Sequence, residues 1–276
     1  MADPPVGACF SVGSIAETYE DIYVPRIFGP WARLLADSAQ LRPGEAVLDI
    51  ATGPGSVARV AAERVGPTGR VVGADISEAM IGIARQKPEL AGAAPIEYLI
   101  GPAAPLPVVD ASFDVVLCQQ GLQFFPDAVA AVHEMRRALK PGGRVAAAVW
   151  QEIAMQPSFA AIDAALRECL SPDVARTYGA PFGVINADGL TALLAEAGFK
   201  DIRVEVRRLP LTLEGGVPQF LAALGASPIA TTIAELDEPT RARFLTAAMR
   251  RLEPLVKDGE VRSEMVSNIV TGRRAD

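Results

Sequence analysis

The feature that most constrains the fold is a short apolar run that leads through a glycine-rich turn into a helix-forming segment. The run reads Val47-Leu48-Asp49-Ile50-Ala51-Thr52-Gly53-Pro54-Gly55-Ser56. Glycines at such a turn let the backbone approach a ligand and leave N–H groups of the helix start pointing at it. Asp75, which ends the next apolar run, can accept both hydroxyls of a ribose. The pattern indicates a nucleoside site.

Short apolar runs alternate with helix-forming segments from about residue 44 onward, which is typical of an α/β fold with a mostly parallel sheet. Strands are expected at residues 46–50, 70–75, 96–100, 113–118, 144–150, 201–211 and 265–272. Helices are expected at residues 56–65, 78–86, 128–139 and 187–197. Lys140-Pro141-Gly142-Gly143 reads as a helix stop and a turn. The pattern predicts a doubly wound sheet.

Three helix-biased segments lie outside this regular pattern, at residues 1–38, 151–185 and 212–258. Long insertions of this kind usually serve as lids or walls of binding sites. We therefore expect a single domain over residues 1–276, in which the three insertions form a helical cap. The core of that domain is expected at about residues 40–150, 186–211 and 259–276.

Charge and hydropathy exclude several classes of partner. A net charge of −7 argues against a protein that grips nucleic acid by its phosphates. No run reaches the roughly 18 apolar residues that a membrane-spanning helix needs. The first residues, Met1 to Pro5, lack a basic region followed by an apolar run, so we expect a cytoplasmic protein. The apolar half of the chain leaves room for a homodimer.

The cysteines and the histidine give no sign of a metal site. Cys9, Cys118 and Cys169 are odd in number and widely spaced, which fits reduced thiols. The single histidine, His133, falls in a helix-forming segment without a partner of matching spacing. We expect no resident metal.

Three further motifs follow the glycine turn in a fixed order: Val72-Gly73-Ala74-Asp75-Ile76-Ser77-Glu78-Ala79-Met80, Phe113-Asp114-Val115-Val116 and Leu139-Lys140-Pro141-Gly142-Gly143. Together the four motifs resemble the class I S-adenosylmethionine-dependent methyltransferases, in particular the small-molecule branch related to the ubiquinone and menaquinone biosynthesis enzymes. The resemblance covers roughly residues 40–150. It implies a Rossmann-like methyltransferase fold of seven strands, one of them antiparallel to the rest.

The same resemblance implies S-adenosyl-L-methionine as the cofactor and S-adenosyl-L-homocysteine as the product. The residues it assigns to the methionine end of the cofactor are Asp49, Ala51, Gly53 and Gly55. Those assigned to the ribose and the adenine are Asp75, Ile76, Met80 and the backbone near Ala103. Many relatives carry an Asp for the adenine amino group where this chain has Pro102. Gln119 and Gln120 are expected to flank the sulfonium.

Aromatic side chains are expected to form the pocket for the methyl acceptor. The candidates for this pocket are Tyr23, Trp31, Phe124, Tyr178 and Phe182, and relatives of this branch imply that Tyr19 and Tyr23 close over the cofactor. A methyl group on a sulfonium is already activated, so alignment and exclusion of water can carry the reaction. We hypothesise transfer to an oxygen, nitrogen or carbon of a hydrophobic small molecule. The candidates for orienting it are Gln119, Gln120, Gln123 and Tyr19.

Two other functions are compatible with the same residues. Gly53 to Ala58 also satisfies the G-x-G-x-x-G/A dinucleotide pattern, which allows an NAD-dependent oxidoreductase. A protein that binds S-adenosylmethionine without transferring its methyl group, as a binding module or a cyclisation catalyst, would keep the same cofactor residues. A nucleic-acid methyltransferase is less favoured because of the acidic balance.

Overall fold

The structure of the protein is a computed structural model that describes residues 13–275. Its regular core begins with strand β1, whose apolar residues are buried on both faces, as expected for a central parallel strand. The elements that follow are α3 (Ser56–Val65), β2 (Arg70–Asp75), α4 (Glu78–Gln86), β3 (Ile96–Ile100), β4 (Phe113–Gln119), η3 (Leu122–Phe124), α5 (Ala128–Ala138) and β5 (Leu139–Trp150). β1 itself spans Ala46–Ile50.

Seven strands form one sheet in the order β3-β2-β1-β4-β5-β8-β6. The first five are parallel, and β8 (Glu260–Arg274) runs antiparallel to both β5 and β6 (Phe199–Leu213). A short eighth strand, β7 (Val256–Lys257), pairs with β8. The expected doubly wound, mostly parallel α/β sheet is confirmed. The strand order reverses between β1 and β4, the place where open α/β sheets bind ligands.

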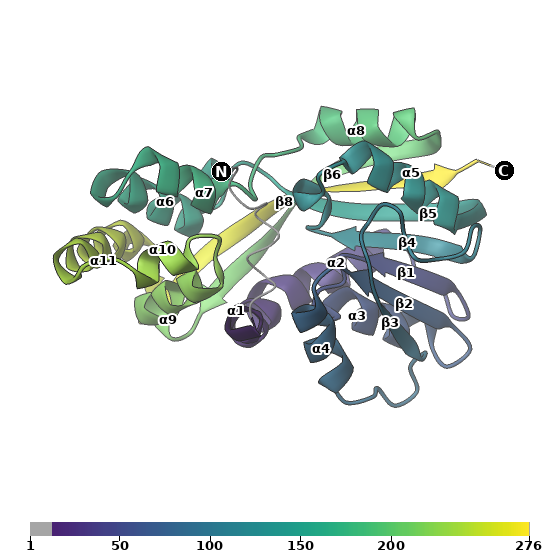
Figure 1. Ribbon diagram of the computed structural model, residues 1–276, viewed down its shortest axis with the longest axis horizontal. Helices are drawn as coiled ribbons and strands as arrows, with labels where there is room; N and C mark the ends of the chain where they lie inside the picture. The colour runs from purple at the N-terminus through teal and green to yellow at the C-terminus, as the bar shows by residue number, and fades with distance from the viewer. Residues whose placement is uncertain (1–12, 276) are drawn as a thin grey trace.

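Helices cover both faces of this sheet (Figure 1). On one face, α2 (Gly29–Ser38) and α3 pack their apolar residues against β1, β4 and β5. On the other face, α5 and α8 (Ala187–Glu196) pack against the same strands. The cavity of the candidate site lies at the carboxyl ends of β1, β2 and β4.

The remaining helices gather beyond one end of the sheet, where β6 and β8 extend past the other strands (Figure 1). They are η4 (Ile153–Met155), α6 (Pro157–Cys169), α7 (Pro172–Gly179), α9 (Gly216–Ala223), η5 (Leu224–Ala226), α10 (Ala230–Ala234), α11 (Glu238–Leu252) and η6 (Glu253–Leu255). The buried apolar residues of α6, α7 and α11 belong to the same apolar cluster as α2 and α3. We refer to these helices as the cap.

The N-terminal segment adds two further helical elements. Helix α1 (Gly13–Thr18) continues into η2 (Tyr19–Phe28), a wider helical segment that contains Pro25 and in which Gly29 donates to the carbonyl of Val24. Proline has no N–H group to bond within a helix, which favours such a widened turn. The first part of the expected segment 1–38, with Cys9, lies outside the described residues.

Several boundaries differ from the sequence prediction: β4 ends at Gln119 instead of 118, β5 begins at Leu139 instead of 144, and α8 ends at Glu196 instead of 197. The helix expected at 128–139 ends at Ala138, because Leu139 pairs with Phe113 and already belongs to β5. The turn at Gly142, with φ of 70°, is absorbed into β5 as an irregularity in the pairing. Strands β6 and β8 are longer than the expected 201–211 and 265–272.

Candidate cofactor and acceptor site

A cavity of about 530 Å³ opens at the carboxyl ends of β1, β2 and β4 and extends beneath the cap. Its first half is formed by the glycine turn, the end of β2 and the segments after β3 and β4. Its second half is formed by Trp150 at the end of β5, by Phe159 and Tyr178 of the cap, by Phe182 in the loop after α7, and by Met265 of β8. The two halves are one continuous space.

The glycine turn holds three residues in the left-handed region, namely Ala51 (φ 56°), Gly53 (φ 54°) and Gly55 (φ 84°). Ala51 and Gly53 line the cavity. Gly55 lies behind them, where a Cβ would stand 2.4 Å from Tyr98 Oη. A glycine is therefore required at 55 both by the backbone angle and by the close approach of Tyr98.

Asp75 is held at the cavity wall by the turn itself. Its Oδ2 accepts a hydrogen bond from the N–H of Gly53 at 2.8 Å, and its Oδ1 accepts one from Ser77 at 2.9 Å. Burial raises the pKa of Asp75, while these backbone donors oppose that effect. Each carboxylate oxygen keeps a second lone pair, so Asp75 can still accept two hydroxyl groups from a ligand.

Asp49 lies beneath the glycine turn and does not line the cavity. Its side chain is fully buried, and its Oδ2 accepts a hydrogen bond from Thr52 Oγ1 at 2.6 Å. Its Oδ1 has no hydrogen-bond partner among residues 13–275. Burial raises the pKa of Asp49 to about 7. The structure thus places Asp49 under the glycine turn, supporting it from within.

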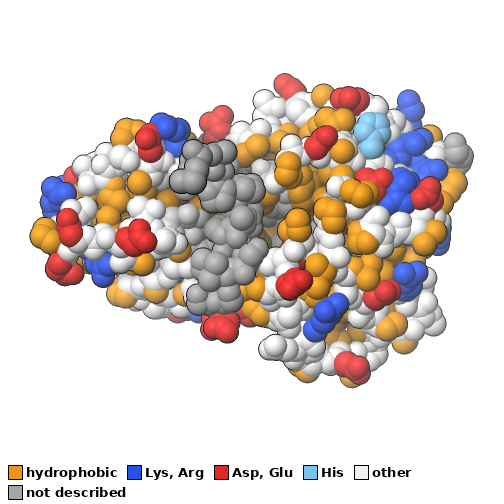
Figure 2. Space-filling model, viewed as in Figure 1, with side chains coloured by type: hydrophobic (Ala, Val, Ile, Leu, Met, Phe, Trp, Pro, Cys, Tyr) orange, Lys and Arg blue, Asp and Glu red, His pale blue; other side chains and the backbone are white. Residues whose placement is uncertain are grey.

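The side chains expected around an adenine also reach the wall. Ile76 is 71% exposed, an unusual state for an isoleucine, and Met80 is buried beside it. Facing them are Gly101, Pro102, Ala103 and Ala104, from the loop after β3. On the face shown in Figure 2, hydrophobic side chains gather on the surface between α4 and α5. An exposed apolar rim of this kind is typical of a site that packs a flat ligand.

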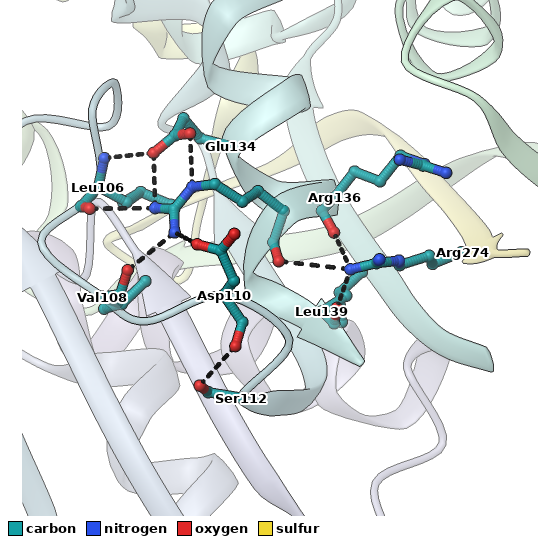
Figure 3. A network of polar contacts seen from close by, with 9 residues as sticks. Leu106, Val108, Asp110, Ser112, Glu134, Arg136, Leu139 and Arg274 are labelled. Carbon is teal, nitrogen blue, oxygen red and sulfur yellow. Dashed lines mark hydrogen bonds and ion pairs between the residues drawn. The ribbon is translucent and has the colours of Figure 1, made fainter. Parts of the chain in front are cut away.

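A network of polar contacts pins the loop after β3 to α5 (Figure 3). Arg137 donates to the carbonyls of Leu106 and Val108 at 3.1 and 2.9 Å, and pairs with Glu134 at 2.7 Å. It also contacts Asp110 at 2.5 Å. Glu134 in turn accepts from the N–H of Leu106 at 2.7 Å. The loop that carries Ala103 into the cavity is therefore fixed from behind.

Two glutamines at the end of β4 point oxygen atoms into a buried part of the wall. Gln119 Nε2 donates to the carbonyl of Phe28 at 3.0 Å, and Gln120 Nε2 donates to Ser267 Oγ at 3.1 Å. Within the described residues neither side-chain oxygen has a hydrogen-bond partner. Both residues line the cavity, but these two oxygen atoms have almost no accessible surface, so they lie behind the wall and not on it. Gln123 instead accepts from the N–H of Trp150 and is not on the wall.

The tyrosines of η2 cover the junction of the two halves. Tyr19 stacks on Phe28 with ring centroids 4.6 Å apart, and Tyr23 meets Tyr19 edge-on at 5.9 Å. Burial raises the pKa of Tyr19 well above its usual range, with a further contribution from the nearby Asp75. Tyr23 Oη donates to the carbonyl of Ala223 at 2.8 Å, which ties η2 to the cap.

Of the aromatic residues expected around the acceptor, four line the cavity: Tyr23, Phe124, Tyr178 and Phe182. Trp31 is buried in the core, edge-on to Trp150 at 5.4 Å, and is not on the wall. Sequence reasoning missed Phe28, Trp150, Phe159 and Met265. Trp150 could have been found as the last residue of a buried strand that ends at the ligand edge.

The wall carries little charge. Among the described residues that line the cavity, the ionisable groups are Asp75, Asp127 and the three tyrosines, with no lysine, arginine or histidine. Burial raises the pKa of Tyr23 and Tyr178 as well, so these hydroxyls keep their protons at neutral pH. A site of this composition can enclose and align an apolar molecule, but it offers no strong base.

In the described part of the chain, no helix has the length and apolar character that crossing a bilayer requires. No set of three or more His, Cys, Asp or Glu side chains in that part is arranged to hold a metal ion.

Comparison with known proteins places this cavity in a family. A model of the ubiE/COQ5 methyltransferase family matches residues 6–170. Nocamycin O-methyltransferase of Saccharothrix syringae is 34% identical over 261 residues, which cover 89% of this chain and 91% of that protein. The ubiquinone/menaquinone biosynthesis C-methyltransferase UbiE of Escherichia coli O1:K1 / APEC is 34% identical over 164 residues, covering 59% and 65% of the two chains.

A solved structure shares the fold. Phosphoethanolamine N-methyltransferase 2 of Haemonchus contortus, in complex with phosphomonomethylethanolamine and S-adenosylhomocysteine, superposes with a TM-score of 0.54 at 20% identity. The match covers 90% of this chain and 53% of that one. The chain belongs to the ubiE/COQ5 methyltransferase family and is an S-adenosylmethionine-dependent methyltransferase.

Proposed function

We propose that the protein methylates an oxygen, nitrogen or carbon atom of a hydrophobic small molecule that binds in the aromatic half of the cavity. One observation carries this proposal, namely that the glycine turn and Asp75 share a single cavity with Trp150, Phe159 and Phe182. A cofactor held at the first half would thus face a molecule held at the second without intervening protein.

The residues of the first half fit S-adenosylmethionine. The open lone pairs of Asp75 suit the two ribose hydroxyls, and Ile76 with Met80 suits the adenine ring. Gln119 and Gln120, at the end of β4, line the cavity beside the glycine turn, where the methionine end would lie. Pro102 stands where many relatives carry an Asp, so backbone groups near Ala103 would bind the adenine edge instead.

Bound S-adenosylmethionine supplies a methyl group that its sulfonium has already activated. The chain's own task is then to align the acceptor and to exclude water. Tyr19, Tyr23 and Phe28 close the junction of the two halves, and the aromatic wall keeps the acceptor side dry. The described lining residues include no Lys, Arg or His, which fits a reaction that depends on alignment and not on a strong base.

The names of the two relatives support the same class of acceptor. One is described as an O-methyltransferase for nocamycin, and the other as a C-methyltransferase of ubiquinone and menaquinone biosynthesis. Both names refer to small organic molecules. We extend to this chain only that class.

Isothermal titration of the purified protein with S-adenosylhomocysteine and with NADH tests the cofactor half. Asp75→Asn should weaken S-adenosylhomocysteine binding about 10- to 100-fold, because an amide cannot accept from Gly53, Ser77 and two ribose hydroxyls together. Asp188→Asn, at an exposed site on α8, is the matched control and should bind as the wild type does. Binding of NADH alone, or equal binding by the Asp75 variant, would overturn the proposal.

Methyl transfer itself is tested by S-adenosylhomocysteine formation with a panel of hydrophobic phenols, quinols and amines. An acceptor-dependent increase supports the proposal, and turnover only with phosphorylated or nucleic-acid acceptors contradicts it. A cytoplasmic location and a homodimer remain predictions from composition, which cell fractionation and sedimentation velocity can check.

A further inference from the structure

Gln120 lines the cavity directly after β4, yet the end of its side chain is turned into the protein. Its Nε2 donates to Ser267 Oγ at 3.1 Å, and its Oε1 has almost no accessible surface. The whole residue is only 4% exposed. The amide of Gln120 is therefore an anchor inside the protein and not a group that meets a ligand.

Ser267, which receives this hydrogen bond, lies on β8 behind the cavity wall. Its side chain is buried, and it is not among the described residues that line the cavity. Its Oγ donates to the carbonyl of Val149 on β5 at 2.7 Å, which leaves the oxygen lone pairs free to accept from Gln120. One hydroxyl thus joins the residue after β4 to both β5 and β8.

The backbone of Gln120 has a conformation that residues other than glycine adopt only at a cost. Its φ is 55°, in the left-handed region. Such a conformation persists where the surroundings hold it in place. The N–H of Gln120 donates to the carbonyl of Ala148 at 2.8 Å, and the side-chain bond to Ser267 is a second tie on the same residue.

The conformation of Gln120 decides where the next residue lies. Gly121 packs so closely on the glycine turn that a Cβ there would stand 2.7 Å from the Cβ of Ala51. Ala51, Gln120 and Gly121 all line the cavity. Relaxation of Gln120 would therefore move the segment after β4 away from the glycine turn, at the place where the methionine end of the cofactor would lie.

We propose that Ser267 is a positioning residue for the cofactor. Through the amide of Gln120 it holds the segment after β4 against the glycine turn, and so shapes the part of the cavity that receives the methionine end. This proposal rests on the proposed function, because that function places the methionine end beside Gln120. Ser267 acts only through Gln120 and does not touch the cofactor.

The test compares two ligands, S-adenosylhomocysteine and 5′-methylthioadenosine. The second ligand keeps the adenosine and the sulfur of the first but lacks its amino-acid chain. Isothermal titration gives both dissociation constants, and the quantity measured is the Kd of 5′-methylthioadenosine divided by the Kd of S-adenosylhomocysteine. A general weakening of the fold lowers both affinities and leaves this ratio unchanged.

Ser267→Ala should lower the ratio about three- to tenfold, because the anchor of Gln120 is lost. Ser267→Cys should lower it as well, since a thiol is a weak acceptor, and it supplies the same test if the alanine variant does not fold. Ser158→Ala is the matched control and should keep the wild-type ratio. Ser158 is a buried serine on α6, and its Oγ has no hydrogen-bond partner among residues 13–275.

Substitutions at position 120 test the route of the effect. Gln120→Gly should lower the ratio less than Gln120→Ala, because glycine adopts a positive φ without the steric cost that alanine retains. Equal ratios in these two variants would show that the backbone conformation is not what the anchor maintains. Adding Ser267→Ala to Gln120→Ala should lower the ratio no further, since the anchored amide is already absent.

An unchanged ratio in Ser267→Ala, an equal fall in Ser158→Ala, or a further fall in the double variant would overturn the assignment. Failure of the proposed function is seen separately, in the wild type. S-adenosylhomocysteine would then bind no more tightly than 5′-methylthioadenosine, before any substitution at position 120 or 267 is made.

Discussion

Gly55 and Tyr98 meet beneath the cofactor half of the cavity, so closely that a methyl group on Gly55 would lie 2.4 Å from Tyr98 Oη. Gly53, two residues earlier in the same turn, also has a positive φ but has open space around its missing Cβ. Alanine substitutions at these two positions therefore separate the energetic cost of the positive φ from that of the contact with Tyr98.

This difference gives a prediction for stability. Gly53→Ala should lower the free energy of unfolding by about 1–2 kcal/mol, the cost of a left-handed alanine. Gly55→Ala should lower it further, and Tyr98→Phe in that background should recover part of the loss by removing the hydroxyl. Urea unfolding without cofactor measures all three, and equal losses at positions 53 and 55 would contradict the argument.

Asp49 should make stability depend on pH. Burial raises its pKa from 3.8 to about 7, so its folded form binds a proton more readily than its unfolded form. Its contribution is fully present below about pH 4 and is lost as the pH rises through about 7. Between pH 5 and pH 8, the wild type should therefore lose about 3 kcal/mol relative to Asp49→Asn.

Denaturant unfolding of both proteins at several pH values checks this prediction. The asparagine can still accept from Thr52, so the variant should fold. Asp75, whose pKa burial also raises, is present in both proteins and largely cancels in the comparison. Parallel curves for the two proteins would show that Asp49 titrates normally in the folded state.

Arg137 should act on cofactor affinity from a distance. Arg137→Leu removes the donors that hold the carbonyls of Leu106 and Val108, and so loosens the loop that carries Ala103 to the wall. We expect weaker S-adenosylhomocysteine binding, about three- to tenfold, and a stability loss of about 1–2 kcal/mol. Faster amide hydrogen exchange in residues 101–108 would identify the loop as the cause.

The control for Arg137 is Arg176→Leu, which removes an arginine from an ion pair with Asp173 on α7 in which both side chains are exposed. Exposed pairs of this kind contribute little, so its cofactor affinity should equal that of the wild type. A comparable loss of affinity in both variants would point to a general effect of lost charge.

Three strands and two helices of the core could be predicted to the residue. The ranges expected for β1, β2, β3, α3 and α4 coincide with the structure, because the strands are apolar runs bounded by Gly, Pro or Asp and the helices repeat apolar residues at helical spacing. The outer strands could not, because their extra length depends on pairing between segments far apart in sequence, such as Leu213 with Val261. Local alternation carries no record of such a partner.

The candidate site likewise contains residues that the sequence could predict and residues that it could not. Asp75 and Gln119 reach the cavity because each ends a core strand at the ligand edge, and Ile76 and Met80 follow β2 in the turn and the first part of α4. Trp31 shows why the rest is harder, since only the packing of α2 decides whether a helical aromatic faces the core or the cavity. Phe159 and Met265 line the same cavity although more than a hundred residues separate them in the sequence, and no sequence motif predicts this.

The helices from α9 to η6, which form the second half of the cap, lie between strands β6 and β8 in the sequence. Strands β6 and β8 pair along their length up to Leu213 and Val261, so the helices between them leave and re-enter the fold at nearly the same point. Under the proposed function, we expect that exchanging this stretch for another set of helices would change which molecule is methylated. The frame around the glycine turn would keep its register, so that acceptor choice would diverge independently of methyl chemistry.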